Sequence, residues 1–114
     1  MDENTLHILW TNDNPITAEF MVFMYATNAL RHKWWDTVHI IVWGATARLL
    51  CENESMRGQL RLFQEAGGHV SACRRCAEKL GVLEQLEAIP DIDIVYIGQE
   101  FTRILKSGEK CITI

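Results

Sequence analysis

The sequence predicts an α/β domain with a mainly parallel five-stranded sheet and helices on both faces. Two observations predict this class: five short apolar runs of strand length recur along the chain, and helical patterns separate them. Parallel strands need crossover connections, and each gap between these runs can hold a helix. The length of 114 residues matches one domain, so residues 1–114 are treated as a single domain.

The first predicted strand covers Leu6–Trp10, and a polar loop follows it. Asn14 can cap a helix that begins at Pro15, where a missing N–H costs nothing, and that continues to about Arg31. The apolar residues of this helix go most of the way round, so we expect something besides its own sheet to cover it. The second predicted strand covers Val38–Trp43.

The next segments continue the alternation. A short helix over Ala45–Asn53 precedes a helix that Ser55 can cap and that Gly67 and Gly68 end. A third strand, His69–Ala72, comes next. The inward stripe of the Ser55 helix is Met56, Leu60 and Phe63.

Cys73 lies at the end of the third strand, before a helix over Arg74–Leu80 that Gly81 closes. The pattern then predicts further elements in the same order. These are one or two helical turns over Glu84–Ile89, a fourth strand over Ile92–Ile97, a last helix marked by Phe101, Ile104 and Leu105 and ended by Gly108, and a fifth strand over Lys110–Ile114.

Charge and composition exclude several classes of function. A formal net charge of -4 disfavours a nucleic-acid partner, since phosphate binding needs a basic surface. The longest nearly apolar stretch, Val38–Ala47, is far shorter than the roughly 20 residues of a membrane span. The polar, acidic segment Met1–Asn4 does not resemble a signal peptide. Four cysteines without a signal peptide are expected to be free thiols, so we expect a cytoplasmic protein with no membrane partner.

The carboxyl ends of the strands are where open α/β sheets bind ligands. Residues that follow the predicted strands should therefore lie along one edge, where two tryptophans and a thiol predict a half-buried pocket. Thr102 either joins this pocket or caps the last helix. The candidate pocket-lining residues are Trp10, Thr11, Asn12, Trp43, Gly44, Arg74, Arg75, Gly98 and Thr102.

Cys73 is the candidate catalytic residue because it falls between a strand and a helix. Backbone N–H groups and the helix dipole favour the thiolate at such a position, and Arg74 and Arg75 add positive charge. The thiolate is the nucleophilic form of cysteine. The alternative is a buried cysteine that acts as a small apolar side chain. The junction favours the reactive thiol.

Cys73 and Cys76 also form a C-x-x-C motif. Three residues apart on a first helical turn, the two sulfurs can meet, which favours a reversible disulfide and makes Cys76 a modulating thiol. Zinc would need two more ligands, and the candidates are His69, Cys51 and Cys111. Because Cys111 is predicted in the last strand and Cys51 in a helix, they are not expected to converge on the motif, and no metal is predicted. No phosphate-binding glycine motif or serine nucleophile elbow occurs, and no cofactor is predicted.

Two of the histidines, His7 and His39, alternate into predicted strands. At such positions a histidine is more often a satisfied core or edge residue than a ligand. We therefore expect His7 and His39 to be hydrogen-bonded within the sheet, with no part in a metal site.

The stretch Val70–Val82 resembles the signature of the DsrE/DsrF/TusD-like sulfur-relay family. That signature has a cysteine that closes a strand, here Cys73, then a short helix and a Gly-Val pair eight and nine residues on, here Gly81 and Val82. Other stretches resemble the DsrE-like branch, and together they cover nearly the whole chain. They are Ile8–Thr11, Met21–Ala26, Val42–Gly44, Gly98 with Phe101 and Thr102, and Ile112–Ile114.

The resemblance implies a three-layer α/β/α domain that assembles into trimers or hexamers. It also implies that Cys73 carries sulfur as a persulfide between donor and acceptor proteins, with no cofactor. Sulfur-transferring members do not all have a second cysteine like Cys76, which leaves open a thiol-redox pair. A non-catalytic oligomeric binding or scaffold protein, with a merely structural Cys73, is the other alternative.

Overall fold

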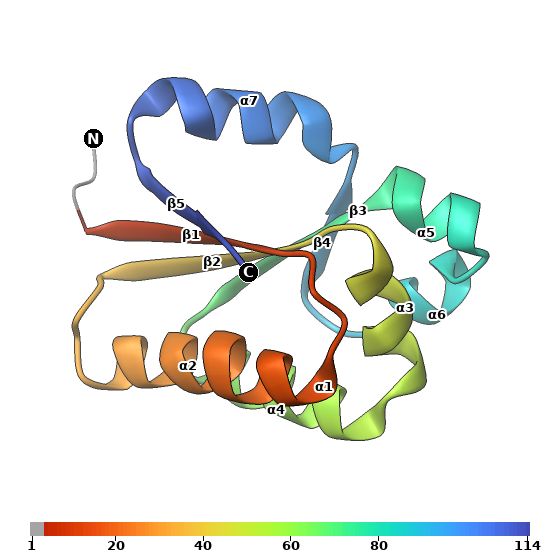
Figure 1. Ribbon diagram of the computed structural model, residues 1–114, viewed down its shortest axis with the longest axis horizontal. Helices are drawn as coiled ribbons and strands as arrows, with labels where there is room; N and C mark the ends of the chain where they lie inside the picture. Colours follow the sequence, from red (N-terminus) through yellow and green to blue (C-terminus); the bar gives the residue numbers. More distant parts are fainter. Residues whose placement is uncertain (1–3) are drawn as a thin grey trace.

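The computed structural model describes residues 4–114 and contains one five-stranded sheet in the order β4-β3-β2-β1-β5. Every pair of neighbouring strands is parallel, which confirms the predicted fold class. Helices lie on both faces of this sheet and complete an α/β/α arrangement (Figure 1). The strands are β1 (Thr5–Trp10), β2 (Thr37–Val42), β3 (His69–Cys73), β4 (Ile92–Val95) and β5 (Lys110–Thr113).

The connection between β1 and β2 is one continuous helix, as predicted. It begins with α1 (Pro15–Thr17), widens into the π-helical segment η1 (Ala18–Phe23) and continues as α2 (Met24–Arg31). The Asn14 side chain accepts the N–H groups of residues 16 and 17 and so caps it. The remaining helices are α3 (Ala45–Glu52), α4 (Glu54–Glu65), α5 (Arg74–Leu80), α6 (Leu83–Glu87) and α7 (Ile97–Ser107).

Two local predictions were wrong. Asn53 caps α4, because its extended backbone lets its side chain accept the N–H of Met56, and Ser55 lies inside the helix. The fourth strand ends at Val95, since Ile97 is already the first residue of α7 and is buried beneath that helix. The segment Met1–Asn4 was predicted not to be a signal peptide. Residues 1–3 of that segment lie outside the described residues. No helix within residues 4–114 combines the length and hydrophobicity that crossing a bilayer requires.

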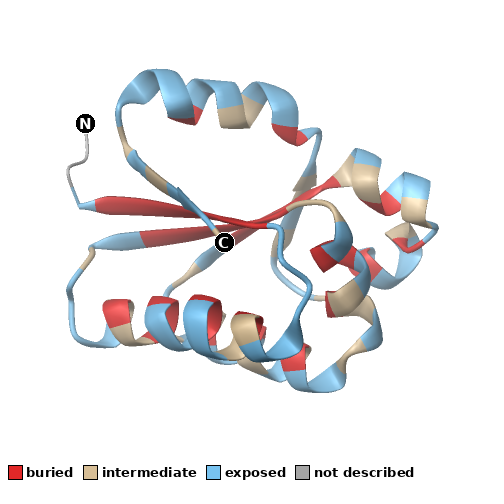
Figure 2. Ribbon diagram, viewed as in Figure 1, coloured by how far each residue is buried: buried red, intermediate tan, exposed pale blue. Residues whose placement is uncertain are grey.

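The two faces of the sheet are covered unequally. The helix over residues 15–31 and helices α3 to α6 contribute to the main core on one face, whereas α7 is the helix that covers the other face within the described chain (Figures 1 and 2). On the α7 face a smaller apolar cluster surrounds Cys73. Its buried members are Leu9, Ile41, Cys73, Ile97 and Ile104. This face therefore has room for polar side chains that the main core excludes.

The helix over residues 15–31 leaves large apolar side chains in solvent, in agreement with its pattern. Ile16 is 69% exposed, Met21 59% and Phe20 50%, and Trp34 just beyond the helix is 56% exposed. We call Ile16, Phe20, Met21, Met24 and Tyr25 the apolar helix face. A contiguous exposed patch of this kind is typical of an interaction surface.

Packing at the end of α4 gives the first prediction. A Cβ atom at Gly68 would clash with the ring of Phe63, which is fully buried, whereas a Cβ at Gly58 meets nothing within 4 Å. We expect Gly68→Ala to lower the free energy of unfolding by about 1–3 kcal/mol. Gly58→Ala, inside α4, should raise it by about 0.5–1 kcal/mol. Urea unfolding measures both, and equal effects would contradict this packing.

Candidate thiol site

Cys73 occupies the strand-to-helix junction that the sequence predicted. It is the last residue of β3 and also the N-cap of α5, with an extended backbone at φ -76° and ψ 112°. Its Sγ accepts the backbone N–H of Cys76 at 3.3 Å. The side chain is almost fully buried, with 4% of its surface exposed. The sulfur therefore takes the place of the oxygen that usually caps a helix.

Cys76 lies beside Cys73 and contacts the connection between β2 and α3, which is therefore part of the site. Burial raises the pKa of the Cys76 thiol, and its hydrogen bond with Cys73 raises the pKa further. Hydrogen bonds from the Gly44 backbone and the Trp43 indole oppose this rise. The structure thus brings together four predicted residues from two connections, and three N–H donors surround the two sulfurs.

Aromatic and aliphatic side chains enclose the thiol pair. The ring of Trp43 packs edge-on against Phe101 of α7, with centroids 5.2 Å apart and planes at 76°. Trp43, Phe101 and Cys76 border the buried cluster that contains Cys73. The pair is therefore half-sheltered from water, between the end of the sheet and the first turns of α7.

Residues after β1 do not join the thiols. Trp10 belongs to the main core on the other face, where it packs edge-on against Phe23, because its side chain alternates away from Leu9. The backbone N–H groups of Thr11 and Asn12 donate to the carbonyl of Ile114 and hold the end of the chain. These contacts are structural. The residues that follow β1 therefore do not line the predicted pocket.

Gly98 and Thr102 belong to α7, and their hydrogen bond stays within that helix. The Thr102 hydroxyl donates to the Gly98 carbonyl one turn earlier at 2.8 Å. Thr102 is exposed. It therefore does not cap the N-terminus of the helix, and its hydroxyl is engaged away from the thiols.

Arg74 and Arg75 direct their charge along α5. Arg74 pairs with Glu78 at 3.3 Å and with Glu87 at 3.8 Å, and Arg75 pairs with Glu78 at 3.8 Å. The expected positive charge at Cys73 is therefore largely neutralised by these carboxylates. The donors that hydrogen-bond to the two sulfurs are the backbone N–H groups of Cys76 and Gly44 and the indole of Trp43.

The other two cysteines stay apart from the pair. Cys51 lies in α3, where its thiol contacts the Val82 carbonyl at 3.8 Å, and Cys111 lies in β5. Burial raises the pKa of both thiols. Within residues 4–114, no three His, Cys, Asp or Glu side chains are arranged to hold a metal ion.

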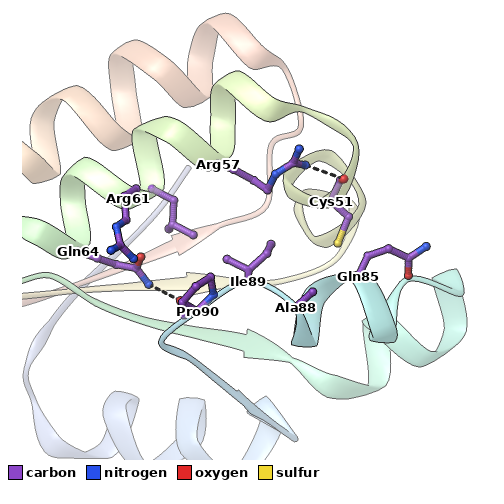
Figure 3. Close-up of a pocket in the computed structure, with 9 residues that line it drawn as sticks. Cys51, Arg57, Arg61, Gln64, Gln85, Ala88, Ile89 and Pro90 are labelled. Carbon is purple, nitrogen blue, oxygen red and sulfur yellow. Dashed lines mark hydrogen bonds between the residues drawn. The ribbon is translucent and has the colours of Figure 1, made fainter.

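A cavity of about 420 Å³ lies beside Cys51, on the opposite side of the sheet from α7 (Figure 3). Its polar side chains hydrogen-bond to backbone carbonyls and so join separate segments of the chain. Arg57 donates to the carbonyls of Leu50 at 3.1 Å and Cys51 at 2.7 Å, at the end of α3. Gln64 donates to the Pro90 carbonyl at 3.0 Å. The cavity is separate from Cys73 and Cys76.

A chain of hydrogen-bonded polar side chains lies on the α7 face of the sheet. Glu109 Oε1 lies 2.8 Å from His7 Nε2, and His7 Nδ1 lies 2.9 Å from His39 Nδ1. His39 Nε2 lies 2.8 Å from Ser71 Oγ. The two histidines are hydrogen-bonded within the sheet, as predicted. Sequence reasoning missed Ser71 and Glu109, and the only signal for them was a histidine in each of two adjacent strands.

His69 flanks this chain. Its ring stacks on His39, with centroids 4.4 Å apart and planes at 14°, and its Nε2 lies 2.7 Å from Asp93. Burial, followed by the charges of His69 and His7, lowers the pKa of His39 from the ordinary 6.5 to about 3. His39 is therefore neutral in the folded protein at neutral pH.

The neutral state of His39 predicts a stability loss in acid. The folded pKa of about 3 lies below the ordinary value of 6.5, so the unfolded chain gains a proton first as the pH falls below 6.5. Between pH 6 and pH 4 this one group should remove about 1.4 kcal/mol of stability per pH unit. His39→Gln should flatten the slope in urea unfolding, and the control His32→Gln, at an exposed helix end, should not. Equal slopes in all three proteins would contradict the neutral His39.

Comparisons with known proteins place the chain beside two solved structures. BT1422 from Bacteroides thetaiotaomicron, described as a conserved protein of unknown function, is 34% identical and superposes with a TM-score of 0.93. The match covers 97% of this chain and 95% of that one. The YchN protein of E. coli, which has a DsrE-like fold, covers all of both chains with a TM-score of 0.74 at 12% identity. At that identity the likeness shows the fold alone. Neither a family model nor a curated protein sequence matches the chain.

Proposed function

We propose that this chain, which belongs to the family of BT1422, is an intracellular sulfur carrier, a function with which its DsrE-like fold is compatible. It holds sulfur as a persulfide on Cys73 and passes it to an acceptor thiol. One observation supports this most directly: Sγ of Cys73 receives the Cys76 N–H at the end of a parallel strand. Such donors stabilise an anionic sulfur.

The two thiols have different roles in this proposal. The raised pKa of Cys76 means that this thiol keeps its proton near neutral pH, and a protonated thiol is a poor nucleophile. Cys73 is the sulfur that attacks. Cys76 modulates it through the hydrogen bond between the two side chains.

Loading needs no oxidant. The Cys73 thiolate attacks the outer sulfur of a donor persulfide, a new S–S bond forms at Cys73, and the donor's own S–S bond breaks. The donor leaves as a thiolate, so electrons and atoms balance. The acceptor thiolate then attacks the outer sulfur on Cys73 in the same way and restores the Cys73 thiolate. Donor and acceptor are thiol proteins, and the carrier acts as a sulfurtransferase without a cofactor.

Cys76 offers a second route of discharge. Once deprotonated, it can attack the inner sulfur of the Cys73 persulfide, which releases hydrosulfide and leaves a Cys73–Cys76 disulfide. A thiol reductant then restores both thiols. The hydrogen bond between the two side chains favours this thiol-redox variant as the second candidate function.

Persulfide loading tests the proposal. After incubation with glutathione persulfide, intact-mass spectrometry should find one added sulfur on the wild type and none on Cys73→Ser. Cys76→Ser should load and hold its sulfur longer, because the internal discharge is lost. Cys111→Ser, which removes a thiol outside the pair, should behave as the wild type.

Two outcomes would contradict this assignment. Loading that survives Cys73→Ser and vanishes in Cys76→Ser would reverse the roles of the two thiols. A wild type that takes up no sulfur, with both thiols reduced at the start, would favour a scaffold with a structural Cys73.

A homo-oligomer, a trimer or a hexamer, accompanies the proposed activity, and the apolar helix face is its proposed interface. Light scattering should report a particle of three or six chains at micromolar concentration. Met21→Glu should shift it towards a monomer, because a charge would be buried in the interface. Leu105→Glu is the matched control, since Leu105 is 58% exposed on α7 and Met21 is 59% exposed. A wild type that remains a 13.1 kDa particle would contradict the assembly.

A further inference from the structure

A groove of about 730 Å³ opens on the α7 face, over β3 and β4. Ser71, His69 and Asp93 lie along it on the strands, and Gln99, Glu100 and Arg103 line it from α7. Asp93 lies directly opposite Ser71 in the strand register. The groove contains a hydroxyl that is only 4% exposed yet hydrogen-bonded to a buried imidazole.

One assignment of the protons gives the hydrogen-bond chain behind Ser71 a direction from Ser71 to Glu109. The Glu109 carboxylate only accepts, so His7 donates to it through Nε2–H. The Nδ1 atoms of His7 and His39 share one proton, and we assign it to His39, so that the His39 Nδ1–H donates to His7 Nδ1. His39 Nε2 is left as an acceptor, and the Ser71 hydroxyl donates its proton there at 2.8 Å. Every side chain in this series has a hydrogen-bond partner, and each shared proton points from Ser71 towards Glu109.

This direction keeps a positive charge off the buried ring of His39. A buried imidazolium at His39 is strongly disfavoured, as its pKa of about 3 shows. When His39 Nε2 receives a proton, its Nδ1 proton can pass to His7, and the Nε2 proton of His7 can pass to Glu109. The charge change then falls on the carboxylate, whose side chain is 16% exposed, and not on the buried rings. The stacked ring of His69 holds His39 in place.

We propose that Ser71 is the nucleophile of a second reactive site, with His39 as its base and the groove as the binding site for a small activated acyl or phosphonyl compound. The Ser71 oxygen bonds to the carbonyl carbon or phosphorus, and the bond from that atom to the leaving group breaks. The leaving group departs with its electron pair as an anion. The Ser71 proton passes to His39 while the relay delivers another to Glu109.

The groove suits a small electrophile with one polar oxygen. Gln99 and Arg103 place amide and guanidinium donors on the α7 wall, and Val95 contributes an apolar surface from β4. The guanidinium is oriented by Glu100, which it contacts at 2.9 Å. In the proposal these donors stabilise the oxygen that gains charge as Ser71 attacks.

A fluorophosphonate probe tests the nucleophile. The Ser71 oxygen should displace fluoride from phosphorus, and tandem mass spectrometry should locate the adduct on Ser71. Ser71→Ala should abolish labelling, while Ser55→Ala, at an exposed serine of α4, should leave it unchanged. Glu109→Gln should slow labelling by roughly 100-fold, since the final proton acceptor is lost. Each readout is independent of sulfur loading on Cys73.

Imidazole nitrogen NMR separates this role from a merely structural one. The wild type should show His39 protonated on Nδ1 and His7 on Nε2, and Glu109→Gln should change these tautomers while circular dichroism shows an unchanged fold. Absent labelling of the wild type, labelling that persists in Ser71→Ala, or a His39 protonated on Nε2 would each overturn the proposal.

Discussion

In the parallel pairing of β2 with β3, His39 lies opposite His69 and Ile41 lies opposite Ser71. Because side chains alternate along each strand, this register also places Cys73 on the same face as Ser71. A slip of one residue would turn every one of these side chains towards the main core. The proposed sulfur carrier and the proposed serine site both depend on this single pairing.

Because the two faces of the sheet are covered unequally, the α7 face can hold buried polar and reactive side chains. The main core is apolar and closed by several helices, whereas the opposite face combines a small apolar cluster with a buried polar chain. Buried polar groups are tolerated where each finds a partner, and no buried side-chain nitrogen or oxygen in residues 4–114 lacks one. α7 covers this face alone within the described chain, so the groove beside it stays open to solvent (Figure 1).

Local signals in the sequence predicted the fold and the position of Cys73, because a strand, a helix and Gly81 follow one another directly. Features that depend on contacts between distant parts of the chain could not be predicted from the sequence. Trp10 was expected beside the thiol, but the face that a strand's last side chain takes depends on packing of the whole sheet. The chain from Ser71 to Glu109 joins three strands and a loop, and strand order could not be read from the sequence.

The central claim is that Cys73 is the nucleophilic thiol of this protein. The pKa values of Cys51, Cys76 and Cys111 are all raised by burial, so these thiols should react slowly near neutral pH. The most direct measurement is the rate of iodoacetamide modification at each cysteine of the folded protein, followed by peptide mass spectrometry from pH 6 to pH 9. Cys73 should be modified first at every pH, and faster modification of Cys51 or Cys111 would contradict the account.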